Sequence, residues 1–431
     1  MEKSFFIETW GCQMNDLDSQ RLAGQLKLRG YRRAASAEQA DLILLNTCSI
    51  REKAENKVYS RLGELRLTRR EGARIGLAGC VAQQEGESIL KRAPWVDFVM
   101  GPANVGALDA ILDEGRKLAL DFPLDRRYDY LSVDRPSAVR AQVTIIEGCN
   151  KNCTFCIVPT TRGREISRPM AEILTEIRWE IEQGRREIEL LGQTVNAYRC
   201  PTEGKDFADL LETVAALPGI LRVRFMTSHP AEMSERLIEV IRDNPAICRF
   251  LHLPVQSGSS RLLRRMKRLY TREHYLRLVD RIRAAVPGMN FSTDLIVGFP
   301  GETEDDFEQT LSLMREVRFG SLFAFRYSPR PGTPALRLGD PIEDRVAAAR
   351  LNRLFAVQEQ IQKEWLQTYV GRTIPVLVEG ASSKDSAVLS GKSECNWTVN
   401  FTSPHIPRPG TLLNVRIDEA RHHSLRGEAV A

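Results

Sequence analysis

The chain has 431 residues, 42% hydrophobic and 27% charged, a composition typical of a soluble globular protein of about three domains. Its formal net charge of +5 permits an RNA partner without requiring one, and no apolar run approaches the roughly 18 residues that cross a membrane. The N-terminus also lacks the apolar stretch of a signal peptide. We therefore expect a cytoplasmic protein with no membrane partner, whose nine cysteines bind metal or do chemistry rather than form disulfides.

The first 120 residues alternate short apolar runs with helical segments. The expected elements are strands at 5–7, 42–45, 74–78 and 98–100 and helices at 16–29 and 51–70. Asp16 would open the first helix as an acidic cap. Because strands alternate with helices, this part is predicted to form an open parallel α/β sheet with right-handed crossovers.

Three cysteines each fall just beyond the carboxyl end of one of these strands: Cys12, Cys48 and Cys80. Ligand sites of open parallel sheets gather outside those ends, so the three thiols are expected to meet at one edge. We interpret them as ligands of one 4Fe-4S cluster, the alternative being three unrelated buried thiols. The remaining cysteines, Cys200, Cys248 and Cys395, are expected to be ordinary thiols of the core or the surface.

A second group of cysteines follows a linker at about 121–140 and a strand at 141–147. Cys149, Cys153 and Cys156 are spaced i, i+4, i+7 on one short loop. Thiolates are the ligands that iron–sulfur clusters take, and three of them leave one iron of a 4Fe-4S cluster open. An open iron can chelate a small molecule and pass it an electron. A zinc site is the alternative, but zinc prefers four ligands and no His lies nearby.

Strand and helix patterns then repeat. Further strands are expected at 187–191, 222–226, 250–253, 291–297 and 322–327, and helices between them include 169–183, 272–285 and 303–317. With the strand that precedes the cysteine loop, this predicts a partial (β/α)6 barrel, curved but not closed. Its active site should lie at the carboxyl ends of the strands, as in closed α/β barrels.

Polar residues recur at those strand ends and suggest a pocket: Gly192, Gln193, Ser228, Gln256 and Asp294. The Gly would let the backbone approach a ligand closely. Two histidines at the same rim, His229 and His252, fit equally well as hydrogen-bonded core residues.

The last part of the chain has a different pattern of predicted elements. A long polar helix at about 344–369 leads into short alternating strands with Gly, Pro and Ser turns, which predict a small β-barrel. Such barrels often bind oligonucleotides, though many are only structural. Candidate phosphate contacts across the chain are Arg264, Arg265, Arg330 and Arg416, unless they belong to solvated faces. Trp397 and Phe401 could stack bases or lie in the core.

Together the six cysteines and several motifs resemble the radical S-adenosylmethionine (SAM) methylthiotransferase family over essentially the whole chain. The matching segments are 11–15, 149–164, 253–259, 294–302, 327–334 and 395–401. Gln13-Met14 is similar to the MiaB branch, whereas the branch that modifies a ribosomal protein usually has Pro-Lys there. The resemblance implies an N-terminal methylthiotransferase domain at 1–120, a radical SAM core at 135–366 and a TRAM RNA-binding β-barrel at 369–431.

The resemblance also implies a reaction. The substrate would be tRNA whose anticodon stem-loop carries N6-isopentenyladenosine, and the enzyme would replace the hydrogen on carbon 2 of that base with a methylthio group. One SAM on the cluster of Cys149, Cys153 and Cys156 would yield a radical. A second SAM would methylate a sulfur held at the cluster of Cys12, Cys48 and Cys80. The two 4Fe-4S clusters would face one another, so the N-terminal sheet edge is expected over the opening of the barrel.

Other expectations are a flavodoxin or ferredoxin as electron donor, a monomer, and no catalytic residue assigned beyond the six cluster cysteines. The nearest alternative is a sister methylthiotransferase acting on threonylcarbamoyladenosine tRNA or on a ribosomal protein. An alternative from another class is a non-catalytic iron–sulfur sensor that binds RNA and needs no SAM pocket.

Overall fold

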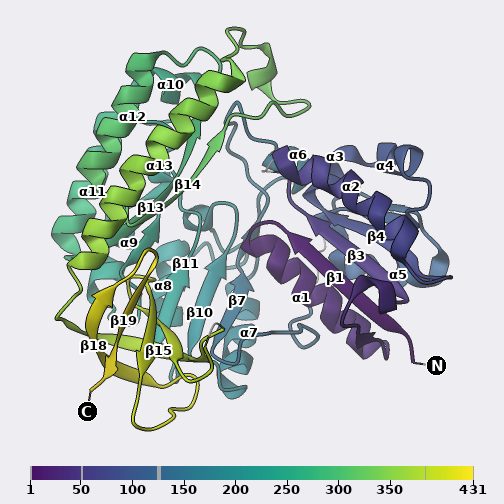
Figure 1. Cartoon of the computed structure of the whole chain (residues 1–431), viewed down its shortest axis with the longest axis horizontal. Helices are drawn as coiled ribbons and strands as arrows, with labels where there is room; N and C mark the ends of the chain where they lie inside the picture. Colours follow the sequence, from purple (N-terminus) through teal and green to yellow (C-terminus); the bar gives the residue numbers. More distant parts are fainter. Residues whose placement is uncertain (1, 50–51, 124–127, 384, 431) are drawn as a thin grey trace.

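The computed structural model describes residues 2–49, 52–123, 128–383 and 385–430. Figure 1 shows three parts: an N-terminal α/β sheet, a central curved barrel and a small C-terminal β-barrel beside the lower end of the central one. The predicted fold class is confirmed in each part, with parallel strands in the first two and a closed barrel in the third.

The N-terminal sheet has six parallel strands in the order β2-β1-β3-β4-β5-β6. They are β1 (Ser4–Trp10), β2 (Arg32–Arg33), β3 (Leu42–Thr47), β4 (Arg74–Gly79), β5 (Phe98–Met100) and β6 (Leu118–Ala119). The helices are α1 (Gln13–Leu28), α2 (Glu52–Thr68), α3 (Cys80–Glu85), α4 (Glu87–Arg92) and α5 (Leu108–Glu114). Along β3, Leu44 packs into one apolar cluster and Leu45 into another, because successive side chains point to opposite faces of the sheet. Helices cover both faces, which explains the unbroken apolar run of this strand.

Helix α1 begins three residues earlier than predicted. Its N-cap is Cys12, not Asp16, and the Asn15 side chain accepts the Cys12 backbone N–H at 3.4 Å. A polar side chain three residues into the helix thus satisfies the N–H that the cap exposes, as in a capping box. The consequence is that Cys12 stands directly at the junction of β1 and α1.

The central barrel contains six parallel strands, as predicted, arranged as two three-stranded sheets with the orders β11-β10-β7 and β12-β13-β14. The strands are β7 (Arg140–Thr144), β10 (Glu187–Leu191), β11 (Arg222–Phe225), β12 (Phe250–His252), β13 (Asn290–Val297) and β14 (Ser321–Arg326). Between the two sheets the structure has an isolated bridge, from Val223 to Ile247, in place of a ladder. A short antiparallel pair, β8 (Ile146–Glu147) and β9 (Ile166–Ser167), brackets the cysteine loop.

Helices pack outside these strands. They are α6 (Val158–Thr161), α7 (Met170–Glu182), α8 (Phe207–Ala215), α9 (Glu235–Asp243), α10 (Ser260–Arg265), α11 (Arg272–Ala285), α12 (Glu304–Val317) and α13 (Asp344–Gln367). Within the part of the chain that the structure describes, none of the helices has the length and apolar character needed to cross a membrane.

The C-terminal strands close into a barrel in the order β15-β16-β17-β19-β18. They are β15 (Thr373–Ala381), β16 (Leu389–Ser393), β17 (Thr398–Thr402), β18 (Leu412–Ala420) and β19 (Ser424–Ala429). Two buried arginines of β11 attach this barrel to the central one: Arg222 donates to the carbonyl of Pro375 at 3.0 Å, and Arg224 to that of Ser393 at 2.7 Å. Trp397 and Phe401 lie in the apolar core of the barrel, so they do not form a surface for stacking bases.

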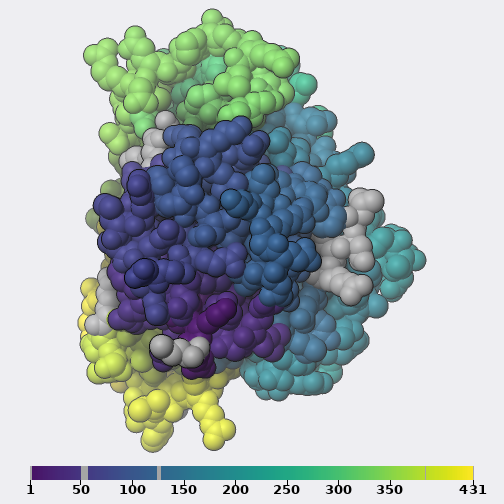
Figure 2. Space-filling view, turned by 90° about the vertical axis from the view of Figure 1, so that its right-hand side faces the viewer, coloured from purple at the N-terminus to yellow at the C-terminus, as the bar shows by residue number. Residues whose placement is uncertain are grey.

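The N-terminal part lies across the open side of the central barrel. In Figure 2 it fills the middle of one face, between green segments of the central part and the yellow C-terminal barrel. Helix α3, which begins at Cys80, packs against α6, which follows the cysteine loop. The sheet edge with the first three cysteines therefore faces the strand ends of the barrel, as the sequence led us to expect.

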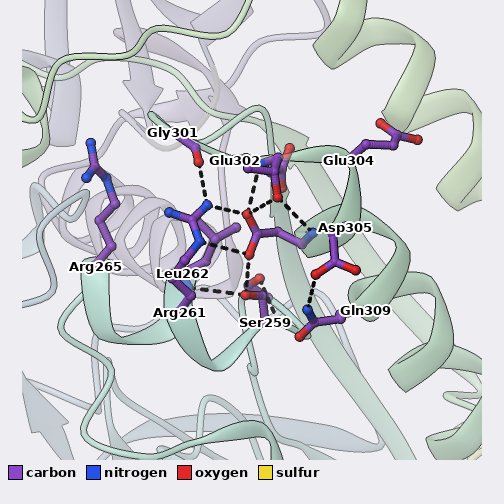
Figure 3. Close-up of polar contacts among 12 residues, drawn as sticks. Ser259, Arg261, Leu262, Arg265, Gly301, Glu302, Glu304, Asp305 and Gln309 are labelled. Atoms are coloured by element: carbon purple, nitrogen blue, oxygen red, sulfur yellow. Dashed lines mark hydrogen bonds and ion pairs between the residues drawn. The ribbon is translucent and has the colours of Figure 1, made fainter.

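A buried carboxylate joins two helices of the central barrel. Asp306 accepts hydrogen bonds from the Ser259 hydroxyl at 2.5 Å and the Thr303 backbone N–H at 2.8 Å, and it pairs with Arg261. Figure 3 shows Arg261 and Ser259 in this network, with Arg261 also reaching Gly301. Because Ser259 and Thr303 are the N-caps of α10 and α12, the one carboxylate holds both helix starts.

We expect Asp306→Asn to lower the free energy of unfolding by about 1.5–3 kcal/mol at neutral pH, the range for hydrogen bonds to a charged group. Burial alone would raise the pKa of this carboxyl. The hydrogen bonds from Arg261, Ser259 and Thr303 outweigh burial and lower the pKa well below 3.8. A lowered folded-state pKa stabilises the protein above pH 3.8, and this contribution is lost as the pH falls through the folded-state value.

Urea denaturation of parent and Asp306→Asn at about pH 7 and about pH 3 measures this difference, which should shrink at the acidic pH. Asp305→Asn is the control, because Asp305 is exposed and its carboxylate accepts from Gln309 of the same helix. An equal loss at both pH values would show that ionisation of Asp306 is not the cause.

Candidate metal centres

The first three cysteines follow three adjacent strands of the N-terminal sheet. Trp10 of β1 pairs with Thr47 of β3, and Thr47 pairs with Gly79 of β4. Cys48 and Cys80 come one residue after these pairs and Cys12 two residues after. The register of a parallel sheet therefore brings three cysteines that are far apart in sequence to one edge.

Two asparagines behind the cysteines fix this edge. Asn15 donates to the Asn46 side chain at 3.1 Å, and Asn46 donates back to the Asn15 carbonyl at 2.8 Å. Gly79 has φ +92°, and a Cβ there would stand 2.4 Å from the Asn46 side chain and 2.6 Å from the Thr47 carbonyl. Only glycine fits the position before Cys80, because both the backbone conformation and the space exclude a side chain.

The three thiols lie close enough to exchange hydrogen bonds. Bonding to Cys48 lowers the pKa of Cys12 to about 7 and that of Cys80 to about 6, while the same bonds raise the pKa of Cys48. Arg162 adds to the lowering at Cys12 and Cys80. Two of the three sulfurs are thus held near the thiolate form, which is the form that ligates metal.

Arg162 comes from the central barrel, just after α6. It is 4% exposed and pairs with the equally buried Asp18 of α1 at 2.8 Å. This pair joins the two parts of the chain beside Cys80, and the carboxylate balances the charge of the guanidinium there.

The second cysteine loop is held at its start by a side chain from the next strand end. Gly148 has φ +74°, and its N–H donates to the Gln193 side-chain oxygen at 2.6 Å. Cys149 donates its N–H to the Gly163 carbonyl at 3.2 Å, which closes the loop between β8 and β9. Gln193, expected in the ligand pocket, therefore supports the loop as well.

Each cysteine of this loop has a distinct surrounding. The Cys149 sulfur lies 3.5 Å from the Thr194 hydroxyl, and the Cys153 sulfur accepts a hydrogen bond from Arg268 at 3.3 Å. Burial, followed by the charge of Cys153, raises the pKa of Cys156 to about 12. Cys153 is buried, whereas Cys149 and Cys156 are partly accessible.

Strained and unpaired groups mark the neighbouring strand ends. Thr227 and Gln256 adopt the left-handed conformation, with φ of 68° and 75°, two residues after the end of β11 and four after the end of β12. Such conformations in non-glycine residues cost free energy and cluster at ligand sites. Ser228 is buried, and among the described residues no group hydrogen-bonds its hydroxyl. These are features of a ligand pocket.

The other residues expected in the pocket differ in what surrounds them. Asp294 lies in β13, and its carboxylate stands 3.5 Å from His252. Gly192 is required by packing, because a Cβ there would meet the Ile146 side chain at 2.4 Å and its carbonyl at 2.7 Å. Burial, with the nearby charge of Arg268, lowers the pKa of His229 to about 3, so this side chain stays neutral and cannot serve as a base near neutral pH.

The donor sets fit clusters with an open iron. Within the ranges 2–49, 52–123, 128–383 and 385–430, no three His, Cys, Asp or Glu side chains gather as the ligands of one metal ion do. The thiolates of a 4Fe-4S cluster each bind a different iron, so the three cysteines of a triad need not converge on one ion. Each triad supplies three soft donors. The unpaired Ser228 hydroxyl in turn fits a polar ligand such as SAM.

Contacts from α1 align the two triads. Gln13 donates to Glu189 of β10 at 3.0 Å, and Glu189 also accepts from Gln142 of β7 at 2.9 Å. Met14 packs with Leu191 at the end of β10. The Gln13-Met14 pair that is similar to the MiaB branch thus contacts strand β10 of the barrel directly.

The four arginines proposed for RNA differ in exposure. Arg264 is exposed on α10, and Arg265 is partly buried and donates to the Leu338 carbonyl at 2.6 Å. Arg330 is 4% exposed, which withholds its side chain from a partner in this conformation. Arg416 is half exposed and faces Asp418 at 3.4 Å.

The sequence patterns missed the arginines beside the cysteines. Arg268 lies in the same basic run, 261–268, as the predicted phosphate contacts Arg264 and Arg265, yet it is buried against Cys153. For Arg162 the sequence offered one indication of a role near the cysteines: it lies six residues after Cys156, within the segment 149–164 that resembles the family. In both cases the direction of the side chain depends on tertiary packing.

Comparison with known proteins agrees with this architecture. Family models match at residues 4–101 (uncharacterized protein family UPF0004), 143–314 (radical SAM superfamily) and 367–430 (TRAM domain). Among solved structures, the radical S-adenosylmethionine methyltransferase TsrM from Kitasatospora setae, with tryptophan substrate and a SAM analogue bound, has a TM-score of 0.57 at 14% identity. That match covers 89% of this chain and 79% of the other, and it shows a shared fold.

Curated relatives align over the full length. A protein of Acidovorax sp. (strain JS42) is 47% identical over 440 residues, covering 100% of this chain and 98% of the relative. One of Burkholderia cenocepacia (strain HI2424) is 45% identical over 446 residues with the same coverage. Both are named tRNA-2-methylthio-N(6)-dimethylallyladenosine synthase. The chain therefore belongs to this family of radical SAM methylthiotransferases, the MiaB branch that its motifs predicted.

Proposed function

We propose that the chain methylthiolates carbon 2 of N6-isopentenyladenosine (dimethylallyladenosine) next to the anticodon of tRNA. The observation that carries this proposal is the pair of three-cysteine sites at one domain interface, in a chain that aligns over its full length with synthases of that name. One site would serve radical formation and the other sulfur transfer. The domain boundaries 1–120, 135–366 and 369–431, a flavodoxin or ferredoxin as donor, and a monomeric state stay predictions.

In this proposal Cys149, Cys153 and Cys156 hold one 4Fe-4S cluster, and Cys12, Cys48 and Cys80 hold the other. The carbon 2–hydrogen bond of the adenine is neither acidic nor electrophilic, so acid–base or nucleophilic side chains cannot replace the hydrogen. With SAM bound, the clusters would supply the radical and sulfur chemistry that this replacement requires. Gln193 fixes the start of the first loop through the Gly148 N–H. Gly192, Gln193, Ser228, Gln256 and Asp294 would line the side on which SAM binds.

The remaining residues orient and enclose the site. The Arg162–Asp18 and Gln13–Glu189 contacts hold the N-terminal sheet edge against the barrel, which fixes the separation of the two triads and limits the entry of water. The neutral His229 moves no proton, so we assign it a structural role. For RNA the exposed Arg264 and the half-exposed Arg416 are the stronger candidates, while Arg265 and Arg330 would need to leave their present contacts.

Anaerobic incubation of the reconstituted protein with SAM, a reductant and isopentenylated tRNA tests the proposal. Mass spectrometry of the digested nucleosides should show 2-methylthio-N6-isopentenyladenosine. Deoxyadenosine without that nucleoside, in a protein loaded with sulfide, would reject this substrate and favour a sister methylthiotransferase. If a protein with both clusters intact forms neither product, the proposal fails and the RNA-binding sensor becomes the better account.

A further inference from the structure

The guanidinium of Arg268 points at a cysteine sulfur of the radical SAM loop. It donates to Cys153 Sγ at 3.3 Å, while its other N–H groups donate to the Tyr270 hydroxyl and the Pro254 carbonyl, both at 2.9 Å. Arg268 is 7% exposed and Cys153 equally so. Three acceptors on three sides fix a buried charge against one sulfur.

The backbone conformation before Arg268 directs its side chain toward Cys153. Lys267 has φ +54°, a left-handed conformation that turns the chain inward after α10. Thr154, next to Cys153, donates its N–H to the Met266 carbonyl and its hydroxyl to the Arg265 carbonyl, both at 3.1 Å. These two hydrogen bonds hold the turn against the cysteine loop, so the backbone itself places Arg268 beside Cys153.

The charge of Arg268 has no carboxylate partner among the residues that the structure describes, because all three of its acceptors are uncharged groups or sulfur. Lys151, the cation within the loop, is paired with Glu232. At the other triad the corresponding cation, Arg162, is paired with Asp18. Each triad thus receives one buried guanidinium. Asp18 balances the charge of Arg162, whereas among the described residues no carboxylate balances that of Arg268.

We infer that Arg268 raises the reduction potential of the cluster held by Cys149, Cys153 and Cys156, and so sets how readily that cluster accepts the electron for SAM cleavage. The inference rests on the proposed function, which assigns a cluster to these cysteines. Reduction adds one electron, and hence one negative charge, to the cluster and its thiolates. An external one-electron donor supplies that electron, and no bond of Arg268 forms or breaks.

The physical reason is that a fixed positive charge stabilises the more negative, reduced state. Hydrogen bonds to the ligand sulfurs, net charge and solvent exposure set iron–sulfur potentials, and a buried charge is screened far less than an exposed one. The arrangement therefore acts on the redox step without touching SAM or the adenine.

The test is a dithionite titration of the reconstituted full chain, followed by electron paramagnetic resonance. Arg268→Met and Arg268→Gln remove the charge, and Gln keeps a donor for Pro254 or Cys153. Each cluster has one redox couple, and the couple of the cluster held by Cys149, Cys153 and Cys156 should have a lower midpoint potential in both variants. At the parent midpoint the ratio of reduced to oxidised cluster should fall by about tenfold, or ~59 mV for one electron. Arg268→Lys should stay close to the parent.

Lys267→Met is the matched control, since it removes an exposed charge from the same turn. Midpoints equal to the parent's in Arg268→Gln, or a shift in Arg268→Lys as large as in the neutral variants, would overturn the inference. If Arg268→Met fails to retain iron, the midpoint potential of Arg268→Gln is the deciding result. A chain with Cys149, Cys153 and Cys156 all changed to Ala shows which of the two redox couples belongs to this loop, because that couple should be missing. If that chain keeps both couples, the proposed cluster assignment has failed, which is a different result from a couple that is present and does not move.

Discussion

Cys153→Ala should release no 5′-deoxyadenosine from SAM above the background without enzyme, and therefore no methylthio product. Cys153 is the buried member of the radical SAM triad, enclosed by Arg268 and by the backbone around Thr154. Removing it leaves two thiols on the loop, Cys149 and Cys156. Two ligands do not hold a 4Fe-4S cluster that needs three or four.

The measurement is anaerobic SAM cleavage followed by chromatography, together with the iron content per chain. We expect iron to fall by about half, because the second triad is untouched. Cys248→Ala is the matched control, since Cys248 is also buried but stands before β12, at the opposite end of the barrel strands. Unchanged iron content and normal SAM cleavage in the Cys153 variant would refute the assignment of the cluster to this loop.

Cys48→Ala should separate the two activities. SAM cleavage should persist, within about tenfold of the parent, whereas 2-methylthio-N6-isopentenyladenosine should disappear. Cys48 is the central thiol of the second triad and bonds to both Cys12 and Cys80. Without it the pKa values of those two thiols lose the bond that lowers them most. The triad then loses one ligand and part of the thiolate character of the others.

Nucleoside mass spectrometry and SAM cleavage, both on the same preparation, check this separation. Cys395→Ala serves as the control, because Cys395 is buried in the C-terminal barrel, away from both triads. A Cys48 variant that still makes the methylthio product would show that the second triad is not the site of sulfur transfer. Loss of both activities would instead show that the two sites depend on one another structurally through α3 and α6.

Local sequence was sufficient for the elements that carry the cysteines. The short apolar run 42–45, between helical segments, favours a central strand of a parallel sheet, and such sheets align the ends of their strands. The positions of Cys48 and Cys80 one residue beyond β3 and β4 followed from that rule. The short spacing of Cys149, Cys153 and Cys156 needed no tertiary information at all.

Element boundaries set by side-chain hydrogen bonds were less predictable. The start of α1 depends on Asn15 bonding back to Cys12, and Asn15 is itself positioned by Asn46 from another strand. The prediction at Asp16 used a general preference for acidic caps and had no access to that contact. The strands β16 and β19, which complete the C-terminal barrel, are short and contain glycine, so their apolar pattern is weak.

The sequence by itself determined the family, through the motifs that resemble it. It also determined the three-part organisation and the two groups of cysteines, through the strand and helix pattern and the spacing of Cys149, Cys153 and Cys156. Tertiary structure alone decided where the arginines point. Arg264 and Arg268 belong to one basic run, yet the left-handed turn at Lys267 leaves the first in solvent and buries the second against Cys153. Whether an arginine lies in solvent or beside a cysteine depends on the residues that the fold places next to it, and those residues lie far away in sequence.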